Sequence, residues 1–438
     1  MNSDAFMEYA FLVMVALIGI EIFVSYMKGK EYYRLNVLIA DVSTGVIFAL
    51  VGVVILIGAL YIYDIVYQRY SLFSLGYQFF PLTSPFQFSN TFSINWYALG
   101  VWSFAVVLAD FIYYWFHRHC HEINLFWANH VTHHSTQEMN LAVAFRGNGL
   151  QRIFEYAYYL SMAVIGMPWE MFLLSHRILK VYQFLVHTRF VGKLGFFEEF
   201  MVTPSNHRVH HGTQKKYLDK NHGGIFIIWD RMFKSFEWET DEPIYGLTKP
   251  VNSFNPITVN LHVYKEMWDH IKKSRSFRDI WMVVFGPPGW KPEHLRTKDD
   301  EFKEPAYTEK YNPKAPIGVM VYVALQATVL LIVGLVIWKV AKLDLNDMTT
   351  LAILSVIIVF SLFSINRTME MKRWSRRTEV VRNAIFILAF LITLFYSKIP
   401  NIELFAIPLI SLSFVSLLWI LIKRKTFFDL SNITNSWY

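Results

Sequence analysis

Cysteine is nearly absent from this chain, since its 438 residues include Cys120 and no other cysteine. A single cysteine excludes an intramolecular disulfide and any cluster of thiolate metal ligands, and it fits a reducing compartment. Nothing around Cys120 marks it as an activated nucleophile, so we interpret it as a small packed residue. The sequence also lacks internal repeats, low-complexity segments and a Gly-rich phosphate loop.

Charged residues are scarce as well: they make up 17% of the chain, whereas hydrophobic residues make up 54%. This composition lies outside the usual range of soluble globular proteins and predicts an integral membrane protein. A helix needs about 20 apolar residues to cross the hydrocarbon core of a bilayer. The predicted spans are 5–26, 42–66, 97–116, 317–338 and 402–422, with shorter ones at 351–365 and 384–396.

The region 150–186 is apolar but is interrupted by Gly166, Pro168 and Glu170. Its sequence is compatible with two spans or with a broken hairpin packed inside the protein.

The first 30 residues contain no small-residue cleavage site after their apolar run. We therefore expect a signal anchor or a first span there.

The formal net charge is +7. Loops rich in lysine and arginine alternate with loops that have few of them. Lys28, Lys30 and Arg34 follow the first span, whereas 64–95 contains Arg69 as its only basic residue. Because basic residues in short loops mark the cytoplasmic side, the N-terminus is predicted outside and the histidine-rich segment inside. The later basic clusters that keep this alternation are Lys310 with Lys314, 367–382 and 423–425. Basic residues thus follow the membrane edge, which excludes a nucleic-acid-binding face.

Histidine is the abundant chemical group, because eleven of the fifteen histidines fall between residues 117 and 211. Three groups have helical spacing: His117 with His121; His130 with His133 and His134; and His207 with His210 and His211. Side chains three or four positions apart share one helical face at about 5 to 6 Å, so two imidazoles can hold one ion. Eight imidazoles exceed the needs of a four-coordinate zinc ion and predict two metal ions with open positions.

A single histidine at a membrane edge is usually an interfacial side chain without a metal. Three groups with matched spacing favour coordination, because crowded buried imidazoles would otherwise leave donors and acceptors unpaired and would repel when protonated. Two other classes of protein also use clustered histidines. A membrane zinc hydrolase needs a general base and about three ligands per metal, and a metal transporter places its ligands across the bilayer midplane.

The ordered motifs HRHCH, HVTHH and HRVHH, followed by KNHGGIFIIWDRMF, resemble the membrane-bound fatty acid hydroxylase and sterol desaturase superfamily. Within that superfamily, the resemblance is to the alkylglycerol monooxygenase family and covers about residues 97–293. The motifs that carry it are DFIYYWFHRHCHEINLFWANHVTHHS, VYQFLVHTRF, TPSNHRVHHG, KNHGGIFIIWDRMFKSFE, YGLTKP and GPPGWKPE.

This resemblance implies an oxygen-dependent enzyme with a diiron centre held by histidines alone. It implies tetrahydrobiopterin as the electron donor and an alkylglycerol as the membrane lipid substrate, whose ether-linked carbon is hydroxylated to release a fatty aldehyde and a glycerol derivative. It identifies no pterin-binding residue. The nearest alternative is a sterol or fatty acid hydroxylase or desaturase of the same superfamily. The implied location is the endoplasmic reticulum membrane of a eukaryote or the cytoplasmic membrane of a bacterium.

Carried over by position, the resemblance assigns metal ligation to the eight grouped histidines and, within FLVHTRF, to His187. It also makes Glu122 functional, because a carboxylate beside His121 can orient an imidazole; a solvated charge is the plain alternative. Asp110 lies one heptad before His117 within apolar sequence, and a carboxylate at that depth is a functional candidate. Support of a ligand histidine and a hydrogen bond to a neighbouring helix are both open for Asp110.

Four further positions qualify the resemblance. His176 lies about three helical turns before His187, and we expect it to support a ligand or to pack. His119 is two residues from both ligands of its segment and is expected to point away from them. Asn206 and His222 are departures, because they stand where the family is expected to have His and Tyr.

The predicted fold is an all-α polytopic membrane protein with a histidine-rich diiron helical core capped on the cytoplasmic side. Its expected parts are N-terminal transmembrane helices at 1–96, a fatty acid hydroxylase-like catalytic domain at 97–254, a cytoplasmic amphipathic cap at 255–316 and C-terminal transmembrane helices at 317–438. In the cap, Tyr264, Met267, Trp268 and Ile271 have helical spacing. They predict a helix that lies at the membrane interface or covers the catalytic domain.

Overall fold

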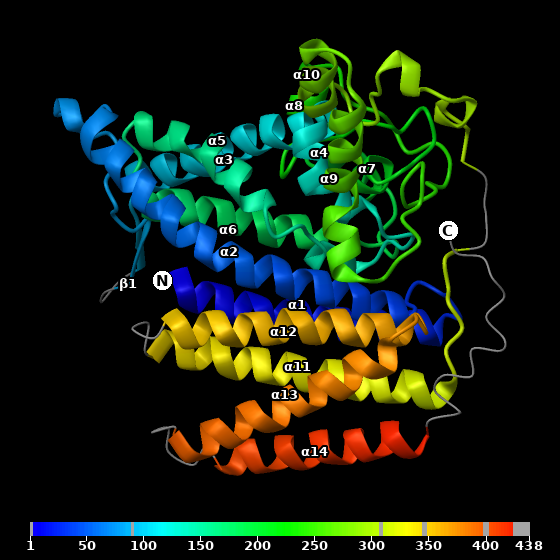
Figure 1. The fold of residues 1–438 in the computed structure, drawn as a ribbon. Coiled ribbons are helices and arrows are strands. Elements are labelled where there is room, and N and C mark those ends of the chain that lie inside the picture. The colour runs from blue at the N-terminus through cyan, green and yellow to red at the C-terminus, as the bar shows by residue number, and fades with distance from the viewer. Residues whose placement is uncertain (1–2, 89–91, 306–309, 344–347, 397–402, 424–438) are drawn as a thin grey trace. The chain divides into compact units, whose positions relative to one another are not determined.

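The computed structural model describes residues 3–88, 92–305, 310–343, 348–396 and 403–423. These residues are mostly helical, and their strands are β1 (Phe86–Phe88) and β2 (Phe92–Ile94), which form one antiparallel pair (Figure 1). The prediction of an all-α membrane protein is therefore confirmed. Three positions used in the sequence predictions, Ile402, Arg424 and Lys425, lie outside the described residues.

The chain divides into two compact units. Unit 1 comprises Met1–Val251 and Val259–Lys310, and unit 2 comprises Asn252–Thr258 and Tyr311–Tyr438. Among the described residues, six helices are long and apolar enough to cross a membrane, which makes this a multi-pass membrane protein. In unit 1 they are α1 (Ser3–Met27), α2 (Leu35–Tyr70) and α3 (Trp96–Glu122). In unit 2 they are α11 (Ile317–Leu343), α12 (Met348–Met369) and α13 (Ser375–Tyr396).

The apolar region whose topology the sequence left open is a hairpin of α5 (Gln151–Val164) and α6 (Trp169–Leu185). Gly166 lies between the two helices with a φ of +89°, a conformation that glycine adopts without strain. Helix α5 packs against α2, and α6 packs against α3. In the resulting core the rings of Tyr63 and Phe172 stack at 5.3 Å. The hairpin is therefore packed among the longer helices of unit 1.

Two short helices of unit 1, α4 and α7, carry five of its histidines. The elements outside the spans and the hairpin are η1 (Phe73–Leu75), α4 (Asn124–His134), η2 (Leu141–Phe145), η3 (Gly195–Glu199), α7 (Pro204–His210), α8 (Ile228–Met232), η4 (Glu293–Leu295) and η5 (Lys298–Asp300).

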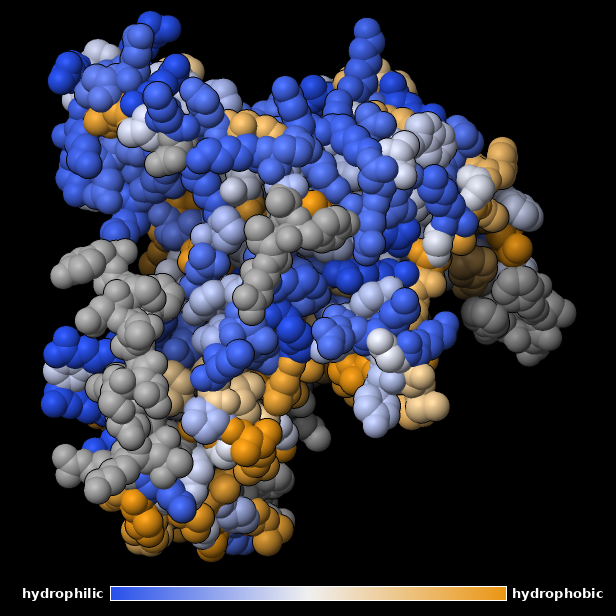
Figure 2. All heavy atoms as spheres, turned by 90° about the vertical axis from the view of Figure 1, so that its right-hand side faces the viewer, coloured by the Kyte–Doolittle hydropathy of each residue, from blue (hydrophilic) through white to orange (hydrophobic). Residues whose placement is uncertain are grey.

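The predicted amphipathic cap forms α9 (Pro256–Lys273) and α10 (Phe277–Phe285). Met267 of α9 is buried in a cluster with Ala128 and Val131 of α4, and Tyr264 and Ile271 pack against the same cluster. The apolar face of α9 therefore covers α4, which bears three of the histidines. Figure 2, which looks onto the right-hand side of Figure 1, shows mostly hydrophilic residues over its upper part, where α7 to α10 lie.

Unit 2 consists mainly of α11, α12, α13 and the shorter apolar helix α14 (Glu403–Ile422), and each packs against the next in the chain. Its interior holds a buried ion pair, in which the Arg382 guanidinium lies 2.8 Å from Glu379 Oε2. The same guanidinium donates to Tyr322 Oη at 3.0 Å and to Gln326 Oε1 at 2.8 Å. This buried charge is thus paired and hydrogen-bonded, as burial requires.

Candidate metal centre

Nine histidines from four helical segments of unit 1 come together in two groups. They are carried by α3, α4 and α7 and by the residues just after α6 and α7. The first group is His117, His121, His130, His134 and His210, and the second group is His133, His187, His207 and His211. Within each group, one ligand-type atom from every residue lies within 4.8 Å of those from the others.

The ring nitrogens of each group face a common centre. In the first group, Nε2 of His130 lies 2.9 Å from Nε2 of His117 and 3.1 Å from Nε2 of His134. The corresponding Nε2 distances in the second group are His133–His187 3.1 Å, His187–His207 2.9 Å and His207–His211 3.2 Å. Two nitrogens bound to one ion at about 2.1 Å and at right angles are about 3.0 Å apart. The observed separations are therefore those of ligands that share an ion.

The two groups abut each other. The rings of His134 and His211, one from each group, stack with their centroids 4.4 Å apart. His207 and His210 form a second stacked pair across the boundary at 5.3 Å. An arrangement of five and four imidazoles in contact fits two neighbouring ions better than one.

Backbone carbonyls fix the tautomer of several rings. A carbonyl can only accept, so a ring Nδ1 beside it must carry the proton and leave Nε2 free to bind a cation. The Nδ1–H donors and their acceptors are His117 to the His222 carbonyl at 2.8 Å, His133 to Arg146 at 3.1 Å, His187 to Gln183 at 2.6 Å and His210 to Lys220 at 2.9 Å. Such partners orient metal-binding imidazoles.

Burial keeps the grouped rings outside α3 neutral. It lowers the pKa of His187 to about 4. Burial, followed by repulsion from neighbouring imidazoles, holds the pKa well below its usual value in the other members outside α3. A neutral imidazole is the form that binds a metal. At neutral pH these seven rings therefore present lone pairs and no competing protons.

Two buried ring nitrogens test whether a cation fits this site. His121 Nε2 and His210 Nε2 are buried and have no hydrogen-bond partner within the described residues. A buried polar atom without a partner is costly, and a bound cation removes that cost for a nitrogen that faces it. The residues present therefore fit a pair of metal ions with imidazole ligands, and iron, copper, nickel and zinc accept such ligands.

Helix α7 is started by a capping box, which places its histidines. Thr203 Oγ1 accepts from the Asn206 backbone N–H at 3.4 Å, and Asn206 Oδ1 accepts from the Thr203 N–H at 3.0 Å. Pro204 stands at the first helical position, where its missing N–H costs nothing. The departure at Asn206 thus has a structural use, because this side chain closes the cap immediately before His207.

A tightly held loop supports His117. Its His222 carbonyl accepts from His117, and the backbone N–H groups of His222 and Gly223 donate to the Asp230 carboxylate at 2.7 Å each. A Cβ on Gly223 would lie 3.0 Å from Asp230 Oδ2, so a glycine lets the chain pass this close. The KNHGG segment therefore holds the His117 ring through its backbone.

Asp110 acts on the other end of the same loop. Its carboxylate accepts from the Ile225 N–H at 2.5 Å, the Phe226 N–H at 3.1 Å and the Trp229 indole N–H at 2.8 Å. None of these partners is a histidine. The sequence left open whether Asp110 supports a histidine directly or bonds to a neighbouring segment. Its contacts are of the second kind, and through that segment Asp110 supports His117 indirectly.

Glu122 lies outside both groups. Its side chain is 45% exposed and pairs with Arg118 at 2.8 Å. The carboxylate that lies beside His121 is Asp219, whose Oδ1 is 3.3 Å from His121 Nδ1. The contact that the sequence assigned to Glu122 is thus made by a residue 98 positions away.

His119, His176 and His222, which the sequence analysis discussed but did not assign as ligands, have different surroundings. His176 is buried and lies 3.0 Å from Glu155 Oε1, outside both groups. His119 also lies outside them, and its Nδ1 is 2.6 Å from the Tyr158 hydroxyl. His222 is buried with its ring centroid 5.0 Å from that of His121, so this departure from the family pattern borders the first group.

Sequence reasoning missed three supporting side chains: Asp219, Asp230 and Gln151. Gln151 Oε1 lies 3.5 Å from His130 Nδ1, and Asp219 has a positive φ of 55° within the turn before His222. The one signal in the sequence was the KNHGG motif, whose neighbouring acids could have been examined as its partners. The contacts of Asp219 and Gln151 join positions 98 and 21 residues apart, which spacing rules do not address.

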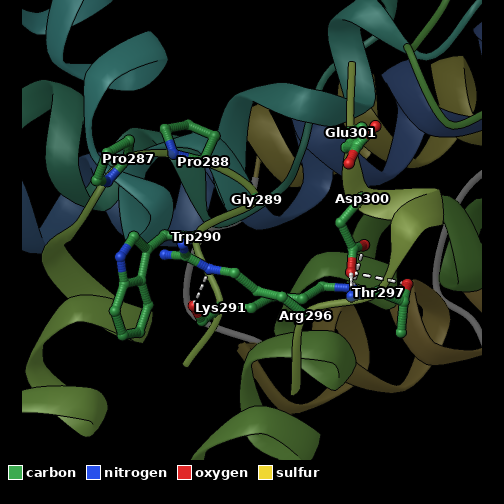
Figure 3. A pocket seen from close by; sticks show the side chains of 9 residues that line it. All are labelled: Pro287, Pro288, Gly289, Trp290, Lys291, Arg296, Thr297, Asp300 and Glu301. Atoms are coloured by element: carbon green, nitrogen blue, oxygen red, sulfur yellow. Dashed lines mark hydrogen bonds and ion pairs between the residues drawn. The ribbon is translucent and has the colours of Figure 1, made fainter. Parts of the chain in front are cut away.

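A surface hollow with a cavity volume of about 470 Å³ follows α10, and no histidine lines it (Figure 3). Its cations already have partners: Lys291 Nζ lies 2.7 Å from Asp300 Oδ1, and the Arg296 Nε–H donates to the Lys291 carbonyl at 3.0 Å. Asp300 also accepts from Thr297. This hollow therefore offers no group to the chemistry of the imidazole site.

Comparison with known proteins places the site in context. Residues 102–235 match the family model described as fatty acid hydroxylase, and this range contains all nine grouped histidines. Alkylglycerol monooxygenase of Homo sapiens is 36% identical over 279 residues, which are 64% of this chain and 58% of that protein. The match thus spans less than two thirds of the human protein.

Two further relatives extend the comparison. Alkylglycerol monooxygenase of Xenopus tropicalis is 32% identical over 384 residues, which are 87% of this chain and 81% of that protein. An ornithine lipid hydroxylase of Rhizobium tropici is 26% identical over 132 residues, which are 30% of this chain and 40% of that protein. No solved structure matches the chain.

Proposed function

Because this chain belongs to the alkylglycerol monooxygenase family, we propose that it is a diiron monooxygenase that hydroxylates the ether-linked carbon of an alkylglycerol. A fatty aldehyde and a glycerol derivative would be released. The observation that carries the proposal is the pair of abutting imidazole groups, with five and four members and no carboxylate among them. This all-nitrogen donor set suits redox-active iron, and two such ions are what the arrangement has room to ligate.

The first group would hold one iron ion and the second group the other. Bound iron supplies the activation of molecular oxygen and the electron transfer that amino-acid side chains lack. The chain itself does three things. It orients the rings through backbone carbonyls, it keeps them neutral by burial, and it excludes water from the surroundings of the reacting carbon.

Insertion of one oxygen atom needs two electrons from outside, because O₂ also yields a molecule of water. We propose tetrahydrobiopterin as this donor, on the strength of the family resemblance. The lipid substrate fits a chain whose metal-binding residues lie at the end of α3 and in the segments that follow. We further propose that the site faces the cytoplasm, in the endoplasmic reticulum or a bacterial cytoplasmic membrane.

Hydroxylation of another polar lipid is the second candidate function. It is favoured by the similarity to an ornithine lipid hydroxylase, which covers 132 residues. The metal site of such an enzyme would be built from the same histidines. Only the identity of the product separates the two functions.

The test is turnover by the full-length protein in lipid nanodiscs, loaded with iron and supplied with O₂, tetrahydrobiopterin and an alkylglycerol. We expect fatty aldehyde in an amount equal to the pterin oxidised, and none from the ester analogue of the same chain length. His210→Gln should abolish the product, whereas His119→Gln should retain it, since His119 lies outside both groups. Absence of aldehyde with every reductant, together with a hydroxylated product from another lipid, would favour the second candidate.

A further inference from the structure

Helix α10 leaves its largest apolar side chains exposed. Phe277, Trp281 and Phe285 are four positions apart and therefore share one face of the helix. Their exposed fractions are 77%, 52% and 42%, and the rings of Trp281 and Phe285 lie 4.4 Å apart. On another face, Val283 is fully buried against the α4 cluster. The helix is thus held by one side and presents a continuous aromatic stripe on another.

The end of α10 is attached to the end of a membrane span. The Asn124 N–H donates to the Gly286 carbonyl at 2.9 Å, and the Asn124 side-chain amide donates to the Val283 carbonyl at 2.8 Å. Asn124 follows α3 after a single residue, and α3 is one of the helices that can cross a membrane. Helix α10 accordingly lies beside α4 at the end of α3 (Figure 1). Its last turn is therefore held close to the end of that span.

Basic residues precede and flank the stripe. Lys272 and Lys273 form the last turn of α9, Arg275 lies between the two helices, and Arg278 lies next to Phe277. All four are exposed. Aromatic side chains with adjacent lysine and arginine are the composition of helices that lie in the headgroup region of a bilayer.

We infer that α10 lies in the boundary between headgroups and acyl chains of the membrane that the protein spans, with Phe277, Trp281 and Phe285 in lipid. The basic residues then face anionic headgroups. Embedding α10 would hold the end of α3, with its two grouped histidines His117 and His121, at the depth of the lipid headgroups. This inference goes beyond the proposed function and requires only the membrane spans and the attachment through Asn124.

Cys120 is the single native cysteine, and it is buried and does not compete for a label. An environment-sensitive fluorophore is attached to Trp281→Cys or to Phe277→Cys in the full-length protein in nanodiscs. The matched control is Glu266→Cys, at an exposed polar position of the preceding helix α9. Nanodiscs of ordinary phospholipid, containing an anionic lipid, are compared with nanodiscs of brominated phospholipid, and iodide serves as the water-soluble quencher.

The expected result is a blue-shifted emission at 277 and 281, a loss of fluorescence in brominated lipid, and little loss with iodide. The label at 266 should show the reverse. Equal quenching by iodide at 266 and 281 would overturn the inference, because the stripe would then face water. Protection of 281 from both quenchers would overturn it as well, since a protein partner would then cover the stripe. Neither readout depends on turnover, so failure of the proposed function would leave this result interpretable.

Discussion

One buried cluster in each unit satisfies its polar groups in the opposite way. In unit 2 the Arg382 guanidinium is buried with the Glu379 carboxylate, and neighbouring hydroxyl and amide groups complete its hydrogen bonds. In unit 1 nine imidazoles are packed nitrogen to nitrogen, without a carboxylate in either group, and several of their buried nitrogens have no hydrogen-bond partner among the described residues. All fifteen histidines lie between residues 117 and 294, so unit 2 contains none.

This difference separates a structural cluster from a ligand-binding one. A buried charge that carries its own counter-charge is complete within the protein, and its expected role is to fix how the helices pack. A set of buried neutral acceptors that face one another is incomplete without a cation. The contrast is open to direct tests, because each kind of cluster responds differently to loss of one member.

Loss of a ligand in the first group should have the largest effect. His210→Gln is expected to remove metal from that group and to abolish product formation, well beyond the 10–100-fold that loss of an outer-shell partner costs. Metal content and turnover of the purified protein are the measurements. His119→Gln is the control, and similar losses in both variants would mean that histidine loss perturbs the fold and not the site.

Breaking the buried ion pair of unit 2 should cost stability without loss of metal. Arg382→Met leaves Glu379 unpaired and is expected to lower the free energy of unfolding by about 3–5 kcal/mol. The double variant Arg382→Met with Glu379→Leu should recover most of that loss. Denaturant unfolding in mild detergent, followed together with the iron content, makes the comparison; a double variant as unstable as the single one would contradict it.

Asp230→Asn should weaken the support of His117 without removing a ligand. The Asp230 carboxylate accepts two backbone N–H groups of the loop whose carbonyl holds His117, and burial raises the pKa of Asp230 to about 6. The affinity for iron should fall by about tenfold, at the low end for an outer-shell partner. An iron-binding titration measures this effect. An unchanged affinity would show that the loop does not support iron binding through His117.

Acid should destabilise metal-free unit 1 and spare unit 2. The pKa of His187 is about 4 in the folded protein and is near 6.5 when the ring is free, so below pH 6.5 the unfolded chain binds the extra proton. Folding stability is therefore lost as pH falls from 6.5 toward 4, at about 1.4 kcal/mol per pH unit for this one residue. Thermal unfolding of the metal-free protein at pH 7 and pH 5.5 should show an early transition from unit 1 alone; equal shifts in both units would be inconsistent with this.

Glu122→Gln should have the smallest effect. The carboxylate is half-exposed and its described partner is Arg118, and surface pairs of this kind contribute about 0–1 kcal/mol. We expect turnover and iron content close to those of the unchanged protein. Asp219→Asn, beside His121, is the matched comparison and should have the larger effect on iron affinity. A strong loss of turnover at Glu122 would instead support the catalytic role that the family resemblance gives it.

The grouping of eight histidines could be predicted from the sequence, because it depends on a local regularity. His117 with His121, and the two HxxHH motifs, follow the helical repeat, and α3, α4 and α7 form where that repeat requires them. His187 has no such spacing, and only the family resemblance indicated it. The spans were predictable for the same local reason, since length and hydropathy define them.

The support of these ligands could not be predicted, because it depends on contacts between distant segments. Asp219 meets His121 across 98 positions, and Asp110 meets Ile225 across 115. The neighbouring carboxylate, Glu122, was the only choice that local spacing offered. Division into two units was equally inaccessible, since 252–258 groups with unit 2 while the residues on either side belong to unit 1.

The proposal that the two imidazole groups bind two iron ions is tested most directly by anomalous X-ray scattering at the iron edge, from crystals of the iron-loaded full-length protein. We expect two iron ions in each chain, one ligated by imidazoles of the first group and one by imidazoles of the second. A single ion, or iron bound away from both groups, would contradict it.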